Sequence, residues 1–130
     1  MSSHSDMQTP LRKVRGLGSA KEGADHFWLQ RVTAVANLFL VAFLIGLLVS
    51  LAGADYATVK STLANPFIAV GLLLLITSGM IHMRLGMQVV IEDYVSHEGL
   101  KLVALMMNTF FAIIVGAASA LAILKLSFGS

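Results

Sequence analysis

Residues 67–101 read FIAVGLLLLITSGMIHMRLGMQVVIEDYVSHEGLK, an apolar run that ends in histidine, arginine, acids and a tyrosine. The first part of this run lies in an uncharged tract of 23 residues, Ser61–Met83. Roughly 20 helical residues cross a hydrocarbon core of about 30 Å, so the tract is long enough to span a membrane. The stretch therefore predicts a transmembrane helix with polar chemistry toward its C-terminal end.

Two further uncharged tracts, Val32–Ala54 and Leu102–Leu124, have the same length. The chain is 57% hydrophobic and only 12% charged, which lies outside the range of ordinary soluble domains. The sequence lacks the period-2 alternation that a transmembrane barrel requires. Because lipid leaves no backbone polar group unpaired, helices are the spanning structure that remains. We therefore predict an all-α membrane protein with three transmembrane helices, part of a multi-subunit helical bundle. The predicted spans lie near residues 28–53, 66–91 and 101–125.

The remaining chain divides simply around these spans. Residues 1–24 are predicted to form a cytoplasmic arm, and residues 25–130 a membrane anchor domain. The arm is too long and too acidic for a signal peptide, since Asp6 and Glu22 precede the first tract. Residues 53–66, GADYATVKSTLANP, are predicted to be a loop in which Asn65 and Pro66 open the second span.

Orientation follows from the basic residues, because Lys and Arg accumulate near cytoplasmic span ends. The loop after the first span carries only Lys60, whereas five basic residues precede that span: Arg12, Lys13, Arg15, Lys21 and Arg31. The N-terminus is therefore predicted to be cytoplasmic, and the second span then delivers Asp93 and Tyr94 to the cytoplasmic boundary. The formal net charge of +2 requires no nucleic-acid partner to explain it.

Helical spacing places the polar residues His82 and Arg84 on two different faces of the second span. His82, Gly86, Val89 and Asp93 fall on one face, so small residues flank the histidine. The gap beside His82 suits either the close approach of another helix or a flat macrocycle whose iron the imidazole binds. A lone membrane histidine can equally well hydrogen-bond to a neighbouring helix. The residues alone leave these alternatives open.

Arg84 lies on another face of the same helix, about 200° from His82. Its guanidinium is expected to reach the cytoplasmic headgroups or to pair with an acid of a partner chain. Asn108 is expected to hydrogen-bond between helices. The chain has no cysteine, so any redox centre that it holds must be ligated through histidine or methionine.

The sequence HMRLGMQVVIEDYV, with Tyr94 twelve positions after His82, resembles the small membrane-anchor subunits of succinate dehydrogenase, the D-type cytochrome b anchors of respiratory complex II. The segment DHFWLQRVTAVAN, residues 25–37, resembles the entrance to the first span in that family. The resemblance extends over three spans, from about Asp25 to Leu124.

This resemblance implies roles for five residues. His82 matches an axial ligand of a b-type haem whose second ligand is a histidine of the other anchor subunit. Arg31 matches an arginine near the haem propionates, and His26 is a further candidate for the propionate or quinone neighbourhood. Asp93 and Tyr94 match the acid and the phenol beside the ubiquinone site.

The function implied by the resemblance is that of a non-catalytic anchor subunit in succinate:ubiquinone oxidoreductase. Its partners would be a second cytochrome b anchor, an iron–sulfur subunit and a flavoprotein, which supplies electrons from succinate, together with membrane lipid. The implied location is a bacterial inner membrane, with the mitochondrial inner membrane as an alternative. An anchor of quinol:fumarate reductase and a non-redox scaffold subunit are the other functions to test.

Overall fold

The computed structural model describes residues 10–11 and 19–129. Within these residues the chain forms four helices, α2 (Ser19–Ser50), α3 (Tyr56–Leu63), α4 (Pro66–Tyr94) and α5 (Glu98–Phe128). Helices α2, α4 and α5 are long and apolar enough to cross a membrane. The predicted all-α fold with three spans is therefore confirmed. Residues 1–9 and 12–18 of the predicted arm lie outside the described ranges, and α2 already begins at Ser19.

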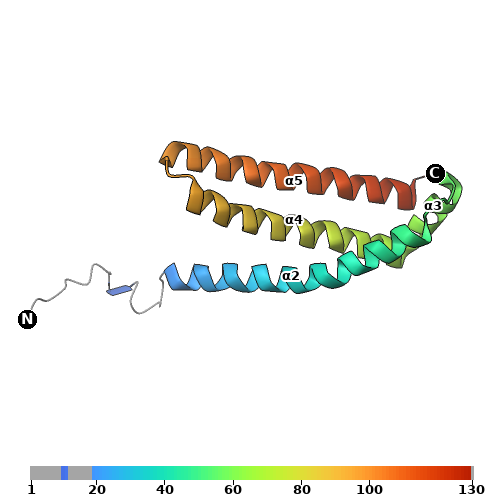
Figure 1. Cartoon of the computed structure of the whole chain (residues 1–130), viewed down its shortest axis with the longest axis horizontal. Coiled ribbons are helices and arrows are strands. Elements are labelled where there is room, and N and C mark those ends of the chain that lie inside the picture. Colours follow the sequence, from blue (N-terminus) through green and yellow to red (C-terminus); the bar gives the residue numbers. More distant parts are fainter. Residues whose placement is uncertain (1–9, 12–18, 130) are drawn as a thin grey trace, which may run out of the picture.

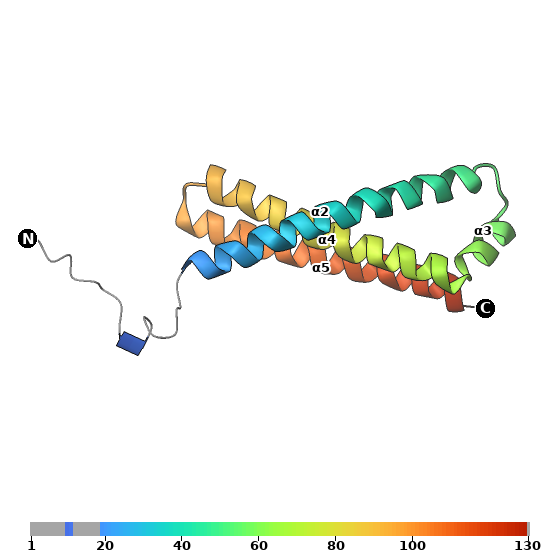
Figure 2. The same ribbon diagram turned by 90° about the horizontal axis from the view of Figure 1, so that it is seen from below.

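Helix α4 lies between the other two long helices and packs against both of them (Figures 1 and 2). In the described part of the chain the backbones of α2 and α5 do not come close to each other. The start of α2 and the α4–α5 connection lie at one end of the bundle, while α3 and the end of α5 lie at the other (Figure 1). This arrangement agrees with the alternating span directions expected from the charge distribution.

The predicted loop between the first two spans contains the short helix α3. After α2, the chain turns through Gly53, whose positive φ of 78° favours glycine. Asp55 then caps α3 by accepting a hydrogen bond from the Thr58 amide at 3.0 Å. Hydrogen bonds from Thr58, first its side chain and then its backbone, hold the pKa of the Asp55 carboxyl below its ordinary value. The capping carboxylate is therefore charged at neutral pH, and its contribution is lost only as the pH falls through that lowered pKa.

The beginning of α4 follows the sequence prediction. Asn65 accepts a hydrogen bond from the Phe67 amide at 3.0 Å, and Pro66 occupies the first turn. Proline is harmless at that position because its missing N–H would have had no helical partner. At the other end α4 continues to Tyr94, beyond the predicted boundary.

The helices approach one another closely where glycine removes a side chain. A Cβ added at Gly71 of α4 would lie 3.0 Å from the Phe43 ring of α2. One added at Gly116 of α5 would lie 3.3 Å from Cγ of Met80 in α4. Both distances are tighter than an ordinary van der Waals contact. Small residues thus set the spacing of the bundle, as is common in membranes, where close packing drives helix association.

Few residues are buried within this bundle. Among the described residues the buried ones are Thr33, Ala69, Leu85, Ile91 and Ala112. Most large apolar side chains of the long helices remain exposed. Exposed apolar surface of this extent requires lipid or other helices to cover it, so the three spans do not enclose a core by themselves.

Single cysteines test the predicted orientation, because the natural chain contains none. In intact spheroplasts, a membrane-impermeant maleimide should label Ser61→Cys in α3 and should leave Ser96→Cys, in the α4–α5 connection, unlabelled until the membrane is opened. The five basic residues before the first span provide the physical reason. The measurement is the mass shift of this chain after reaction. The reverse labelling pattern would place Tyr94 on the wrong side for a cytoplasmic electron donor.

Candidate functional site

The histidine of the second span faces α2. His82 is half-buried on α4, and its Nδ1 lies 3.1 Å from Oγ1 of Thr33 on α2. Thr33 is only 5% exposed. One turn before His82, the Ser78 hydroxyl donates to the Thr33 carbonyl oxygen at 3.4 Å. His82 and Ser78 thus tie α4 to a single position on the first span.

Beside this contact the two helices border an open cavity of about 570 Å³, a volume within the range typical of small-molecule and cofactor sites. The cavity brings together three of the predicted site residues, His26, Arg31 and His82. Gly86 and Val89, two members of the predicted face of α4, line it with His82, whereas Asp93 does not. The remaining lining residues are Gly23, Phe27, Gln30 and Ala34, all from α2.

The cavity combines an apolar wall with polar groups. Cζ of Arg31 lies 4.4 Å from the centroid of the Phe27 ring, so a cation–π contact holds the guanidinium at the cavity edge. His26 Nε2 and Gln30 Oε1 are buried and have no hydrogen-bond partner within the described chain. Buried polar atoms normally find a partner. The polar capacity of these two atoms is therefore unused within the described chain.

Sequence reasoning missed two polar residues of this region, Gln30 and Thr33. With His26 and Asn37 they follow the spacing i, i+4, i+7 and i+11, which places all four on one face of α2. Asn37 Oδ1 is likewise buried without a partner in the described chain. A polar stripe of this spacing within an apolar tract was the pattern that could have identified these residues.

Asp93 and Tyr94, the other predicted site residues, lie apart from the cavity. They are the last two residues of α4, and both are exposed, Tyr94 to 83%. Tyr94 lies twelve positions after His82 on the helix, a rise of about 18 Å. Helix α4 therefore carries a half-buried histidine and, farther along the helix, an exposed phenol.

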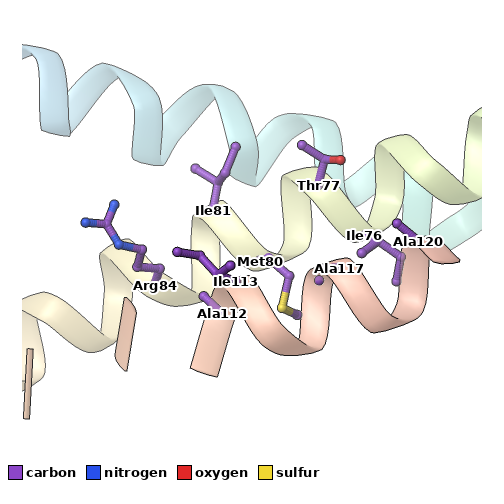
Figure 3. A pocket seen from close by; sticks show the side chains of 10 residues that line it. Ile76, Thr77, Met80, Ile81, Arg84, Ala112, Ile113, Ala117 and Ala120 are labelled. Atoms are coloured by element: carbon purple, nitrogen blue, oxygen red, sulfur yellow. The ribbon is translucent and has the colours of Figure 1, made fainter. Parts of the chain in front are cut away.

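The opposite side of α4 packs on α5. The Arg84 Nε donates to Thr109 Oγ1 at 3.2 Å, and Asn108 donates to the Arg84 carbonyl oxygen at 2.9 Å. The prediction that Asn108 bonds between helices is confirmed. Arg84 also lies at one end of an apolar pocket of about 290 Å³ between α4 and α5 (Figure 3). Arg84 thus lies on the side of α4 that faces α5, and His82 on the side that faces α2, as their angular separation predicted.

The loop after α4 contains His97, which caps α5: its Nδ1 accepts a hydrogen bond from the Leu100 amide at 3.3 Å. It remains exposed, and it does not line the cavity beside His82. The capping role explains a polar residue at this position without assigning it to the site.

A bundle of three apolar spans with most of its large apolar side chains exposed is the architecture of a membrane subunit that packs against lipid or other helices. Residues 5–123 match the family described as the succinate dehydrogenase/fumarate reductase transmembrane subunit, and the chain belongs to this family. No solved structure gives a significant match.

Individual relatives narrow the family further. The chain is 31% identical to the succinate dehydrogenase hydrophobic membrane anchor subunit of Rickettsia bellii over 84% of its own length and 87% of that protein. It is 30% identical to the protein of the same name from Paracoccus denitrificans over 94% of both chains. It is 31% identical to the succinate dehydrogenase membrane anchor subunit of Reclinomonas americana, over 72% and 80% of the two chains. The predicted resemblance to succinate dehydrogenase anchor subunits is thereby confirmed.

Proposed function

We propose that this chain is the membrane anchor of a succinate:ubiquinone oxidoreductase in a bacterial inner membrane. In this proposal His82 is an axial ligand of a b-type haem shared with a second anchor subunit, and Tyr94 and Asp93 form part of the ubiquinone site. The observation that carries the proposal is the cavity between α2 and α4, in which His82 and Arg31 meet two buried polar atoms that lack partners.

The residues of the cavity suit a haem. Such a group requires an imidazole ligand, apolar contacts for the macrocycle and polar partners for its two carboxylates. His82 supplies the first, Phe27 and Val89 belong to the apolar wall, and Arg31 provides a cation suited to a carboxylate. His26 and Gln30 add hydrogen-bonding capacity. When bound, a haem supplies one-electron redox chemistry to the complex.

The second haem ligand is assigned to the partner anchor. Among the residues that the structure describes, no three His, Cys, Asp or Glu side chains gather in a metal-binding group. Of the two histidines that line the cavity, His26 and His82, the proposal assigns only His82 to the iron, and the open side of the cavity leaves room for a ligand from another subunit. The exposed apolar surface of α2 provides a place for that subunit's helices.

Reduction of ubiquinone requires donors for its carbonyl oxygens, entry from lipid for its tail and access to cytoplasmic water for two protons. The exposed end of α4 meets these requirements, because Tyr94 lies at the rim of the bundle. The hydroxyl of a tyrosine can donate a hydrogen bond to a quinone oxygen. Asp93, also exposed, is positioned to orient a basic partner or to accept protons from water.

The electrons come from subunits outside this chain. A flavoprotein that oxidises succinate and an iron–sulfur subunit would dock at the end of the bundle that carries Tyr94. The chain by itself is then an anchor and a wall of the quinone pocket rather than a complete enzyme. The relatives described above carry succinate dehydrogenase in their names, which favours this direction over quinol:fumarate reduction.

A tagged version of this chain provides the test. The complex purified from membranes should contain a flavoprotein, an iron–sulfur protein and a second small membrane protein, identified by mass spectrometry. After reduction with dithionite it should show the optical bands of b-type haem and should reduce a ubiquinone analogue with succinate. A pure complex without haem and without quinone reductase activity would favour the non-redox scaffold.

A further inference from the structure

Thr33 is unusual among the described residues because it is the one polar side chain that the bundle buries. Its Oγ1 has three polar neighbours: the Leu29 carbonyl oxygen at 2.8 Å, the Gln30 carbonyl oxygen at 3.1 Å and His82 Nδ1 at 3.1 Å. Two of these neighbours are carbonyl oxygens, which only accept hydrogen bonds. The hydroxyl has a single proton to donate.

The geometry of the hydroxyl decides how it meets the imidazole. The shortest contact is the bond to the Leu29 carbonyl, the ordinary back-bond of a helical threonine. Once the proton is donated there, the oxygen has only lone pairs to offer His82. A hydrogen bond at 3.1 Å then requires that Nδ1 carry the imidazole proton, which leaves Nε2 with a lone pair.

We propose that Thr33 is the positioning residue that fixes the Nδ1–H tautomer and the ring orientation of His82, so that Nε2 is the nitrogen available to a metal in the cavity. This inference rests on the proposed haem-binding function. Metal-bound histidines generally donate their other ring N–H to an acceptor, which sets both tautomer and orientation. Here the acceptor comes from the first span, and the ligand comes from the second.

The surrounding contacts make the arrangement rigid. Ser78 donates to the Thr33 carbonyl oxygen at 3.4 Å, so α4 contacts both the backbone and the side chain of the same residue. The Thr33 hydroxyl is also tied to its own helix at Leu29. Rotation of the His82 ring would break this partly buried hydrogen bond and leave the ring N–H without its partner.

Thr33→Val tests this role, since it keeps the β-branched shape and removes the acceptor. In the purified complex we expect haem affinity to fall by about 10–100-fold, the usual effect of losing an outer-shell partner of a metal ligand. The remaining haem should show an altered low-spin electron paramagnetic resonance spectrum. Thr33→Ser keeps the hydroxyl and should therefore retain the wild-type haem affinity and the wild-type electron paramagnetic resonance spectrum. An unchanged spectrum and affinity in Thr33→Val, or an equal loss in Thr33→Ser, would overturn the proposal.

Thr77→Val is the matched control, because the Thr77 hydroxyl makes the same kind of back-bond, to the Leu73 carbonyl at 2.8 Å, with no histidine contact. It should leave haem affinity and spectrum at wild-type values. If Thr77→Val caused the same changes as Thr33→Val, both results would be explained by a general effect on helix packing, and the positioning role of Thr33 would be wrong.

A second measurement separates this proposal from the haem assignment. Nitrogen NMR of the full chain in lipid bilayers, with ¹⁵N-labelled histidine and His82→Gln to assign the signals, reports the tautomer without haem. The wild type should carry the proton on Nδ1, and Thr33→Val should lose that preference. A proton on Nε2 in the wild type would contradict the proposal even in a complex that binds haem. A complex without haem would contradict the proposed function, while the NMR result still decides the tautomer.

Discussion

Replacement of His82 by alanine should abolish the low-spin haem b spectrum of the purified complex. The substitution removes the imidazole that lines the cavity between α2 and α4. Loss of an outer-shell partner alone typically lowers metal affinity about 10–100-fold, and loss of the ligand itself should cost more. The measurement is haem content per complex, together with the optical spectrum after reduction with dithionite.

The control for this variant is His97→Ala. His97 is exposed, caps α5 and does not line the cavity, so its removal should leave the haem spectrum unchanged. Dye reduction by succinate should persist in His82→Ala wherever the flavoprotein and iron–sulfur subunits are still bound. A wild-type low-spin spectrum in His82→Ala would show that another residue ligates the iron.

Replacement of Tyr94 by phenylalanine should lower the succinate:quinone reductase rate by about one to two decades. The ring is retained, but the hydroxyl proposed to donate to a quinone oxygen is lost. A hydrogen bond removed from a desolvated polar group costs about 1–3 kcal/mol, and the rate falls accordingly if the bond strengthens as the quinone is reduced. Because Tyr94 is exposed at the end of α4, packing within this chain should be unaffected.

The informative quantity is the ratio of quinone reduction to dye reduction in the same membranes, with haem content as a measure of assembly. Tyr56→Phe is the matched control, since Tyr56 is the other tyrosine of the chain and lies in α3 at the opposite end of the bundle. It should leave both activities unchanged. A wild-type ratio in Tyr94→Phe would show that Tyr94 is only an interfacial anchor. A fall of both activities together with haem content would indicate that Tyr94 acts in assembly.

Hydropathy found the three spans but not the ends of the helices. Helix α2 begins at Ser19, before the predicted span, and α4 and α5 extend past their predicted boundaries to Tyr94 and Phe128. Hydropathy detects the segment that lies in hydrocarbon, whereas a helix continues through the polar interface as long as its backbone bonds are satisfied. The eight-residue helix α3 was not predicted, because hydropathy detects only apolar tracts that are long enough to span. A short helix with an N-cap does not need such a tract.

The sequence by itself determined the class of protein, the number of spans and the separation of His82 from Arg84 on α4, because membrane thickness and helical periodicity act along a single chain. Only the tertiary structure decided which face of α2 meets His82, and hence that Thr33 bonds its Nδ1 and that Gln30 joins the cavity. The physical reason is that contacts between helices depend on how two surfaces fit together. Periodicity assigns a residue to a face of its own helix, but packing against another helix selects the residue it meets.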